Sequence, residues 1–199
     1  LQELVQAYSS FHFPSLSESS RRLYTAMLEK LMQNHSSIEQ ITMRSLRNQM
    51  DSIGKRTPVQ ANRFASVVSS FMQYCFERGF CDNNPARGLR RFKETPSSRK
   101  LNESQLKVFA EGLESAWCHD DIKLWVRVAL STGCRGKEVS GMDWSEIDGS
   151  TWTLPGSRTK NGREHLVYLP DSLLSAIEQS RSQRTGKVLN ATSEGARQA

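Results

Sequence analysis

The chain has 199 residues, of which 37% are hydrophobic and 24% charged, and its formal net charge is +6. This length allows one large domain or two small ones, and the apolar content is enough for ordinary globular cores. No apolar run approaches the roughly 20 residues of a membrane-spanning helix, so we expect no membrane association. The N-terminal segment has no basic start followed by an apolar stretch, which excludes a secretory signal there.

The excess positive charge lies in the first half of the chain. Residues 1–99 hold 14 of the 27 Lys+Arg and 8 of the 21 Asp+Glu, which leaves 13 of each for residues 100–199. A basic half beside a neutral half indicates an anionic polymer as partner, because basic side chains that neutralise phosphates release counterions. A basic surface that only confers solubility is the alternative.

The cysteines and histidines show no spacing typical of a metal site or a disulfide framework. Cys75, Cys81, Cys118 and Cys134 form no C-x-x-C pair, and no histidine is spaced to complete a zinc site with them. We therefore expect free thiols in a reducing cytoplasm and no metal.

The first half of the sequence predicts a helical bundle. Ser17 can cap a helix over residues 18–33, and a shorter helix is expected near residues 42–52. The strongest periodic signal predicts a long helix over residues 58–78, with proline at its first turn and Gly79 just past its end. Its apolar residues recur every three or four positions and indicate a core-facing stripe: Phe64, Val67, Val68, Phe71, Met72, Cys75 and Phe76.

A stretch that contains Pro and Ser and lacks periodicity, residues 93–99, predicts a linker between domains of residues 1–92 and 100–199. At the start of the second domain, Asn102 and Gln105 resemble a capping box that begins a helix. The next helix is expected to bury one face, formed by Ile122, Trp125, Val126, Ala129 and Leu130.

The rest of the second domain predicts a hairpin and one more helix. Residues 151–154 and 165–169 are expected strands, and Asn161-Gly162 is a strong hairpin signal between them. A helix is expected to start at Asp171. From residue 185 the chain turns polar, and Val188-Leu189 is the one candidate for a further element. The predicted fold class is therefore mainly α with a small antiparallel β-sheet (α+β).

The residues that carry chemistry lie at two turns of the second domain. Arg135 follows a Thr-Gly turn, where its side chain can leave the core and grip two oxygens of one phosphate. Glu138 is spaced to hold that guanidinium. Lys160 flanks the Asn-Gly turn and can protonate a leaving oxygen, while Asn161 and Arg163 can add phosphate contacts. A surface Arg–Glu pair and a basic turn kept for solubility are the alternatives.

These motifs resemble the tyrosine recombinase family, also called phage integrases. The family's arginine motif reads T-G-x-R-x-x-E and a hydrophobic residue, and its lysine lies in a T-K-N/T-G-like turn, which matches residues 159–162. Residues 1–92, which end near R-G-F-C-D-N-N-P-A, resemble the family's helical core-binding domain. The residues that match the arginine motif and its C-terminal extension are Thr132, Gly133, Arg135, Glu138, Val139, Gly141, Trp144, Ile147 and Asp148.

The resemblance implies a site-specific recombinase that breaks and rejoins duplex DNA through a 3′-phosphotyrosyl intermediate, as in the integration of prophages and other mobile elements. Arg135 would stabilise negative charge on the phosphoryl oxygens, and Lys160 would protonate the leaving 5′ oxygen. It also implies no cofactor, no small-molecule substrate, and a homotetramer of the full-length protein on two DNA sites.

Duplex DNA is therefore the expected partner, with further contacts in the first half of the chain. The start of the helix over residues 58–78 is the best candidate, because a helix N-terminus favours a phosphate and amide side chains can bond base edges. The expected DNA-binding residues are Thr57, Gln60, Asn62 and Arg63 at this helix, Arg21 and Arg22 near another helix start, and Arg90, Arg91 and Lys93 at the linker.

The chain departs from the family pattern after the second strand. The family needs a His/Lys-x-x-Arg box, a further His or Trp and a tyrosine nucleophile there, whereas no His or Tyr follows Leu169. The arginines of this stretch, Arg181, Arg184 and Arg197, fit no such box. Tyr168 has apolar neighbours and is expected in the core rather than as the nucleophile.

Since the sequence also begins without Met, we expect a fragment or processed form that binds DNA without cleaving it. A non-catalytic DNA-binding module or regulator derived from an integrase is the alternative.

Overall fold

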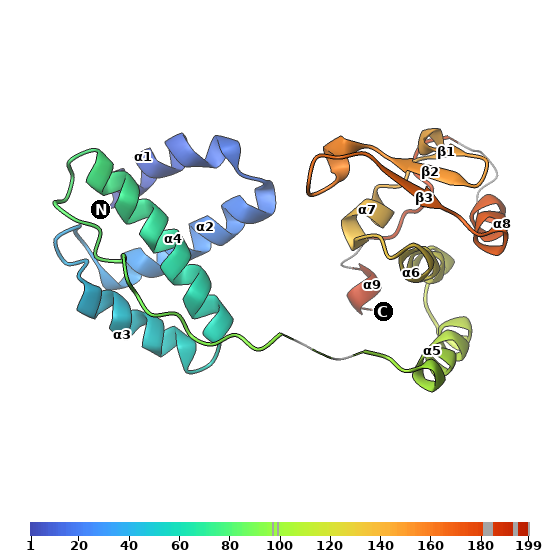
Figure 1. Cartoon of the computed structure of the whole chain (residues 1–199), viewed down its shortest axis with the longest axis horizontal. Coiled ribbons are helices and arrows are strands. Elements are labelled where there is room, and N and C mark those ends of the chain that lie inside the picture. The colour runs from blue at the N-terminus through green and yellow to red at the C-terminus, as the bar shows by residue number, and fades with distance from the viewer. Residues whose placement is uncertain (97, 99, 181–184, 193–194, 199) are drawn as a thin grey trace. The chain divides into compact units, whose positions relative to one another are not determined.

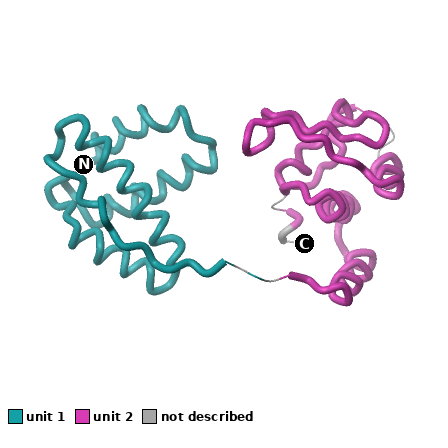
Figure 2. The backbone as a smooth tube through the Cα atoms, viewed as in Figure 1, with its two compact units in different colours: residues 1–98 teal, residues 99–199 magenta. Residues whose placement is uncertain are grey.

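In the computed structural model the chain divides into unit 1, Leu1–Ser98, and unit 2, Arg99–Ala199 (Figure 2). The structure describes residues 1–96, 98, 100–180, 185–192 and 195–198. Two residues of the expected linker, 97 and 99, and two arginines that fit no family box, Arg181 and Arg184, lie outside the described residues. Within the described part, no helix combines the length and apolar character that a membrane crossing requires.

Unit 1 is built around helix α4 (Pro58–Glu77), which packs against three other helices (Figure 1). These are α1 (Gln2–His12), α2 (Glu18–Asn34) and α3 (Met43–Gly54), and a 3₁₀ turn, η1 (Phe13–Ser15), joins the first two. The expected bounds of the helices in this half are confirmed to within one or two residues.

Local chemistry explains where these helices begin and end. The Ser17 hydroxyl accepts a hydrogen bond from the Ser20 amide at the start of α2, and Thr42 and Ser45 form a capping box at the start of α3. Helix α4 begins at Pro58 and is followed by Gly79, whose φ of 73° suits a residue without a Cβ. The sequence therefore sets each terminus locally.

The core of unit 1 follows the predicted apolar stripe. Phe64, Val68 and Phe71 are fully buried on α4, and the ring of Tyr8 from α1 packs edge-on against Phe71 at 5.5 Å between centroids. Phe76, the last residue of the predicted stripe, is 44% exposed, because the helix ends beyond the packed region. The stripe is thus confirmed except at its C-terminal end.

Unit 2 combines helices with a three-stranded antiparallel sheet in the order β1-β2-β3 (Figure 1). Its helices are α5 (Glu103–Ser115), α6 (Asp120–Thr132), α7 (Gly136–Ser140), α8 (Asp171–Gln179) and α9 (Gly195–Gln198). The strands are β1 (Ile147–Asp148), β2 (Thr151–Leu154) and β3 (His165–Tyr168), with 3₁₀ turns η2 (Trp144–Glu146) and η3 (Gly156–Arg158). The predicted fold class, mainly α with a small antiparallel sheet, is confirmed.

The core of unit 2 lies between one face of this sheet and helices α6, α7 and α8. Trp152, Val167 and Ile177 are buried there, and the pairing of Trp152 with Val167 fixes the register of β2 and β3. Val188, from the one candidate element beyond residue 185, is also buried, and its amide donates to the Met142 carbonyl at 3.0 Å. Part of the core therefore comes from a segment with only a weak sequence signal.

The expected buried face of α6 is confirmed only in part. Trp125 and Ala129 pack against the core, as expected. Leu124 and Val128, which were not expected there, are buried, whereas Leu130 is 57% exposed. The helix carries apolar side chains on neighbouring stripes, and packing against α7 and α8 selects the stripe that contains Leu124 and Val128.

Tyr168 corrects a second expectation, since it is 66% exposed rather than in the core. Side chains alternate along a strand, so Leu166 and Tyr168 lie on one face of β3, and Val167, which is buried, lies on the other. The apolar neighbours of Tyr168 in the sequence therefore say nothing about its own burial.

Candidate functional site

The turn between α6 and α7 presents Arg135. Gly133 ends α6 in the left-handed conformation with φ of 66°, and its amide donates to the Ala129 carbonyl at 3.0 Å. A residue with a Cβ is strained at such an angle, which explains the glycine. The chain then becomes extended at Arg135, the N-cap of α7, and the arginine side chain is 68% exposed.

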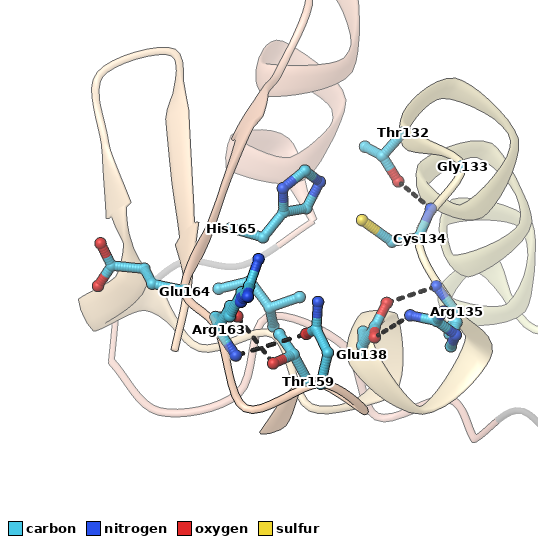
Figure 3. Close-up of a pocket in the computed structure, with 11 residues that line it drawn as sticks. Thr132, Gly133, Cys134, Arg135, Glu138, Thr159, Arg163, Glu164 and His165 are labelled. Atoms are coloured by element: carbon cyan, nitrogen blue, oxygen red, sulfur yellow. Dashed lines mark hydrogen bonds and ion pairs between the residues drawn. The ribbon is translucent and has the colours of Figure 1, made fainter. Parts of the chain in front are cut away.

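Glu138 holds this arginine at two points. One carboxylate oxygen accepts the Arg135 backbone amide at 2.7 Å, and the other accepts the guanidinium Nη1 at 3.1 Å (Figure 3). The Glu138 side chain is 7% exposed, so this contact is shielded on one side. An ion pair with a mostly exposed arginine contributes only about 1 kcal/mol or less to the stability of the fold. Its main effect is to orient the guanidinium.

The loop between β2 and β3 connects the two strands where the sequence predicted. The strand pairing ends at Leu154 and His165, so the connection spans residues 155–164. The Gly162 amide donates to the Thr159 carbonyl at 3.4 Å, which places Lys160 and Asn161 at the centre of the turn. Only Gly162 of this turn has a positive φ, whereas a two-residue Asn-Gly hairpin needs one at both positions. The antiparallel pairing and the bounds of the connection are therefore confirmed, and the Asn161-Gly162 turn within it is not of the two-residue type.

Arg158 ties the base of this loop to the domain core. Its guanidinium pairs with Glu146 at 2.7 Å, and the same carboxylate oxygen accepts the Trp152 indole N–H at 3.0 Å. Gly141 lies beside this arginine, and a Cβ there would meet the guanidinium. Arg158 therefore has an internal contact that positions the loop.

The arginine turn and the loop line the same pocket, which has a volume of about 330 Å³ (Figure 3). From the α6–α7 turn come Thr132, Gly133, Cys134, Arg135 and Glu138, and from β2, the loop and β3 come Leu154, Thr159, Asn161, Arg163, Glu164 and His165. The structure thus brings four predicted site residues together: Arg135, Glu138, Asn161 and Arg163. Their functional roles stay predictions.

Lys160 does not line this pocket. It is exposed in the turn between two residues that do, Thr159 and Asn161.

Cys134 lines the pocket next to Arg135 in the sequence. Burial raises the pKa of its thiol, which keeps the thiol protonated near neutral pH. Among the described residues, no group of His, Cys, Asp and Glu side chains is placed to hold a metal ion.

In unit 1, three of the predicted DNA-binding residues are exposed on the first turns of α4. They are Thr57, Gln60 and Arg63. Lys55 and Arg56, just before them, are exposed as well and were missed, although their basic side chains beside the helix start are a visible sequence signal.

The structure corrects the expectation for Asn62. This residue is 8% exposed, and its amide nitrogen donates to the Phe92 carbonyl at 2.9 Å and to Glu94 at 2.7 Å. Its amide oxygen accepts the Phe92 N–H at 2.8 Å. Since both ends of the amide are occupied, Asn62 fastens the segment that leads to the linker onto α4 instead of facing outward.

Several predicted basic residues also have internal partners. The Arg21 Nε donates to the Phe13 carbonyl at 2.8 Å and to the Leu16 carbonyl at 3.0 Å. Arg22 pairs with Glu18, and Arg91 donates to the Asn62 carbonyl and, at 2.9 Å, to the Ser66 hydroxyl. Arg90 and Lys93 are exposed.

The sequence of the chain has a relative among curated proteins, although no protein-family model matches it. Over 142 residues it is 25% identical to prophage integrase IntA of Escherichia coli (strain K12), a match that covers 65% of this chain. The matched region is 34% of the relative, so the chain spans about a third of that protein's length.

The fold is similar to solved integrase structures. A lambda integrase dimer bound to a COC′ core site matches with a TM-score of 0.81 and 15% identity, over 96% of this chain and 73% of that one. A lambda integrase tetramer bound to a Holliday junction matches with a TM-score of 0.80 and 15% identity, over 96% and 59%. The chain therefore has the fold of these integrase structures, and its sequence match is to a prophage integrase, in agreement with the resemblance expected from the motifs.

Proposed function

We propose that this chain, which belongs to the tyrosine recombinase family by its fold and by its similarity to a prophage integrase, binds duplex DNA and carries part of a recombinase active site. One observation supports this most directly. The Arg135 turn and the loop that bears Lys160 meet at one pocket, although 25 positions separate them in the sequence. A phosphate in that pocket would be within reach of both motifs.

In this proposal Arg135 binds two oxygens of the scissile phosphate and stabilises the charge that develops on them. Glu138 keeps the guanidinium aimed at the pocket through its two contacts. The contact leaves Nε and Nη2 of Arg135 without a partner among the described residues, so these donors remain for a ligand. Asn161 and Arg163, from the opposite wall, add contacts to the backbone.

Lys160 is the proposed general acid. It is exposed at the centre of the turn, and its long side chain can extend toward the edge of the pocket. Protonation of the leaving 5′ oxygen would follow attack by a tyrosine, with a 3′-phosphotyrosyl bond as the product. Since that bond conserves the phosphodiester energy, rejoining needs no ATP.

For the whole protein we propose a homotetramer on paired DNA sites. One of the similar structures is a lambda integrase tetramer bound to a Holliday junction. In the same proposal, the exposed face at the start of α4 contributes further phosphate contacts, through Lys55, Arg56, Gln60 and Arg63.

The alternative is a module that binds DNA without cleaving it. No tyrosine follows Tyr168 in this sequence. Tyr168 itself lies on the face of β3 that is opposite to the buried Val167, so it does not face the core side of the sheet.

A suicide substrate, a duplex nicked near a candidate cleavage site, separates these two functions. We expect the chain to bind this duplex, as measured by fluorescence anisotropy, but to form no adduct that survives denaturing electrophoresis. An adduct that Tyr168→Phe removes would show that the nucleophile lies within the chain and would contradict the assignment of a partial active site.

In a longer protein that supplies a nucleophilic tyrosine, Arg135→Ala should reduce adduct formation by on the order of 100-fold or more while duplex binding stays largely intact. Arg127→Ala is the matched control, because Arg127 is a partly exposed arginine of α6 that pairs with Glu114 outside the pocket. Normal adduct formation by Arg135→Ala would rule out its proposed role. A lack of adduct in the unmodified longer protein would favour the binding module.

A further inference from the structure

His165 occupies a distinctive place at the pocket. It is the first residue of β3, paired with Leu154 at the end of the strand ladder. The alternation of side chains puts it on the same face of β3 as Val167, which is buried in the core. His165 is exposed because the core ends at this point and the pocket begins. Figure 3 shows its imidazole across the pocket from Thr132 and Cys134.

Among the described residues, no hydrogen bond or ring contact holds the imidazole of His165 in the fold, in contrast to the other histidines. His35 is held by the Leu31 carbonyl and the Ser45 hydroxyl, His12 stacks on Tyr8, and the His119 Nδ1 caps α6. In the part of the chain that the structure describes, neither nitrogen of His165 has a hydrogen-bond partner. Both nitrogens are therefore available to a ligand in the pocket.

The charges around His165 favour an anion. Arg135 comes from the α6–α7 turn and Arg163 from the loop. Both oxygens of Glu138 are engaged by Arg135, and the Glu164 carboxylate points away from the pocket (Figure 3). The groups left to meet a ligand are two guanidinium groups, an amide and an imidazole, which together suit a phosphate.

We propose that His165 is a further phosphate-binding residue of unit 2, and that its protonation strengthens the grip of this pocket on the DNA backbone. The inference rests on the proposed DNA binding. A phosphodiester carries the same single charge across the neutral range, and guanidinium and carboxylate groups keep theirs. An imidazole gains a second N–H donor and a positive charge as the pH falls through its titration range near 6.5. His165 is the imidazole among the groups that line this pocket, and burial raises the pKa of the Cys134 thiol away from the neutral range.

The first test measures the affinity of the whole chain for a fluorescein-labelled random-sequence duplex at fixed salt. We expect binding to be about three- to ten-fold tighter at pH 6 than at pH 8, and His165→Gln to remove most of this difference. His165→Arg, which keeps a positive charge, should bind at pH 8 as tightly as the unmodified chain does at pH 6. The matched control is His119→Asn, which keeps an N-cap acceptor at an exposed histidine outside the pocket and should leave the pH dependence unchanged.

The second test follows the imidazole itself by ¹H–¹⁵N NMR, with the His165 signals assigned by their loss in His165→Gln. Addition of the duplex should raise the pKa of His165, and Arg135→Ala should abolish the rise, because both residues bind the same phosphate. A merely structural histidine would show no such coupling.

The outcomes separate the two proposals. If the duplex binds and the His165 titration stays the same with and without DNA, His165 does not bind phosphate, while the proposed DNA binding stands. If the chain does not bind the duplex at either pH, the proposed function itself fails.

Discussion

The two units place their candidate binding groups in different ways. In unit 1 the main exposed candidates lie at the start of a single helix, α4, whose opposite face is the core of the unit. In unit 2 the candidates come from a turn and a loop that are distant in sequence and meet at a pocket. A helical surface needs only its own periodicity to present side chains, whereas a pocket needs its walls to be positioned by other contacts.

The difference explains where sequence reasoning succeeded. In unit 1 the helix α4 was predicted correctly, but two of the predicted DNA-binding residues, Asn62 and Arg21, have hydrogen-bond partners within the unit. In unit 2 the pocket depends on contacts such as Arg158–Glu146, which fixes the base of the loop. We conclude that the sequence does not tell whether a polar residue on a regular helix binds a partner inside the protein or outside it. For motif residues at turns, this assignment is easier.

The largest expected effect tests whether the two units are energetically separate. Phe71→Ala removes a fully buried ring from the core of unit 1 and should cost about 3–5 kcal/mol of that unit's unfolding free energy. Calorimetry should show the unit 1 transition at a lower temperature and the unit 2 transition unchanged. Phe76→Ala, on the same helix but 44% exposed, is the control and should shift neither by much. Equal shifts of both transitions would mean that the units unfold together.

A second pair of variants contrasts internal and external polar residues on α4. Asn62→Ala leaves the amide and carbonyl of Phe92 without their partner and should cost about 1–3 kcal/mol of stability, with little direct effect on DNA affinity. Arg63→Ala should leave stability within about 0.5 kcal/mol, because its side chain is exposed, and should lower the salt dependence of DNA binding by about one phosphate contact. Denaturant melts measure the stability of each variant, and fluorescence anisotropy at several salt concentrations measures its DNA binding. The reverse pattern would place Asn62 at the DNA.

The smallest expected effect is the contribution of Tyr8 to the pH dependence of unit 1. Burial raises the pKa of the Tyr8 phenol to about 12, partly offset by its hydrogen bond with Ser70. The fold therefore favours the neutral phenol, whose contribution to stability is complete below the unfolded pKa of about 10 and is lost as the pH rises from there toward 12. Tyr8 should account for about 1 kcal/mol of the fall in the unfolding free energy of unit 1 between pH 9 and 11, and Tyr8→Phe should remove this part of the fall. Burial also raises the pKa of Cys75, so a further fall should persist in Tyr8→Phe. Tyr168→Phe, at an exposed tyrosine of unit 2, should not alter it. A pH profile that is the same with and without Tyr8 would contradict the assignment.

The sequence by itself determined the elements that local chemistry controls. Caps at Ser17, Thr42 and Asn102 start three helices, Gly79 and Gly133 follow the ends of two, and the apolar period of α4 defines its buried face. The arginine and lysine motifs were also recognisable, because each is a short run of residues whose spacing can be matched directly. In every such case the information lies within a few neighbouring positions.

Only the tertiary structure decided which side chains share a surface. It brought Arg135 and the loop of residues 155–164 to one pocket, turned Tyr168 outward, and gave Asn62 internal partners. It also placed His165 at the pocket and buried Val188, whose sequence signal was weak. Each of these outcomes depends on contacts between segments far apart in the chain. The free energy of such contacts comes from packing and burial that no local pattern of residues specifies.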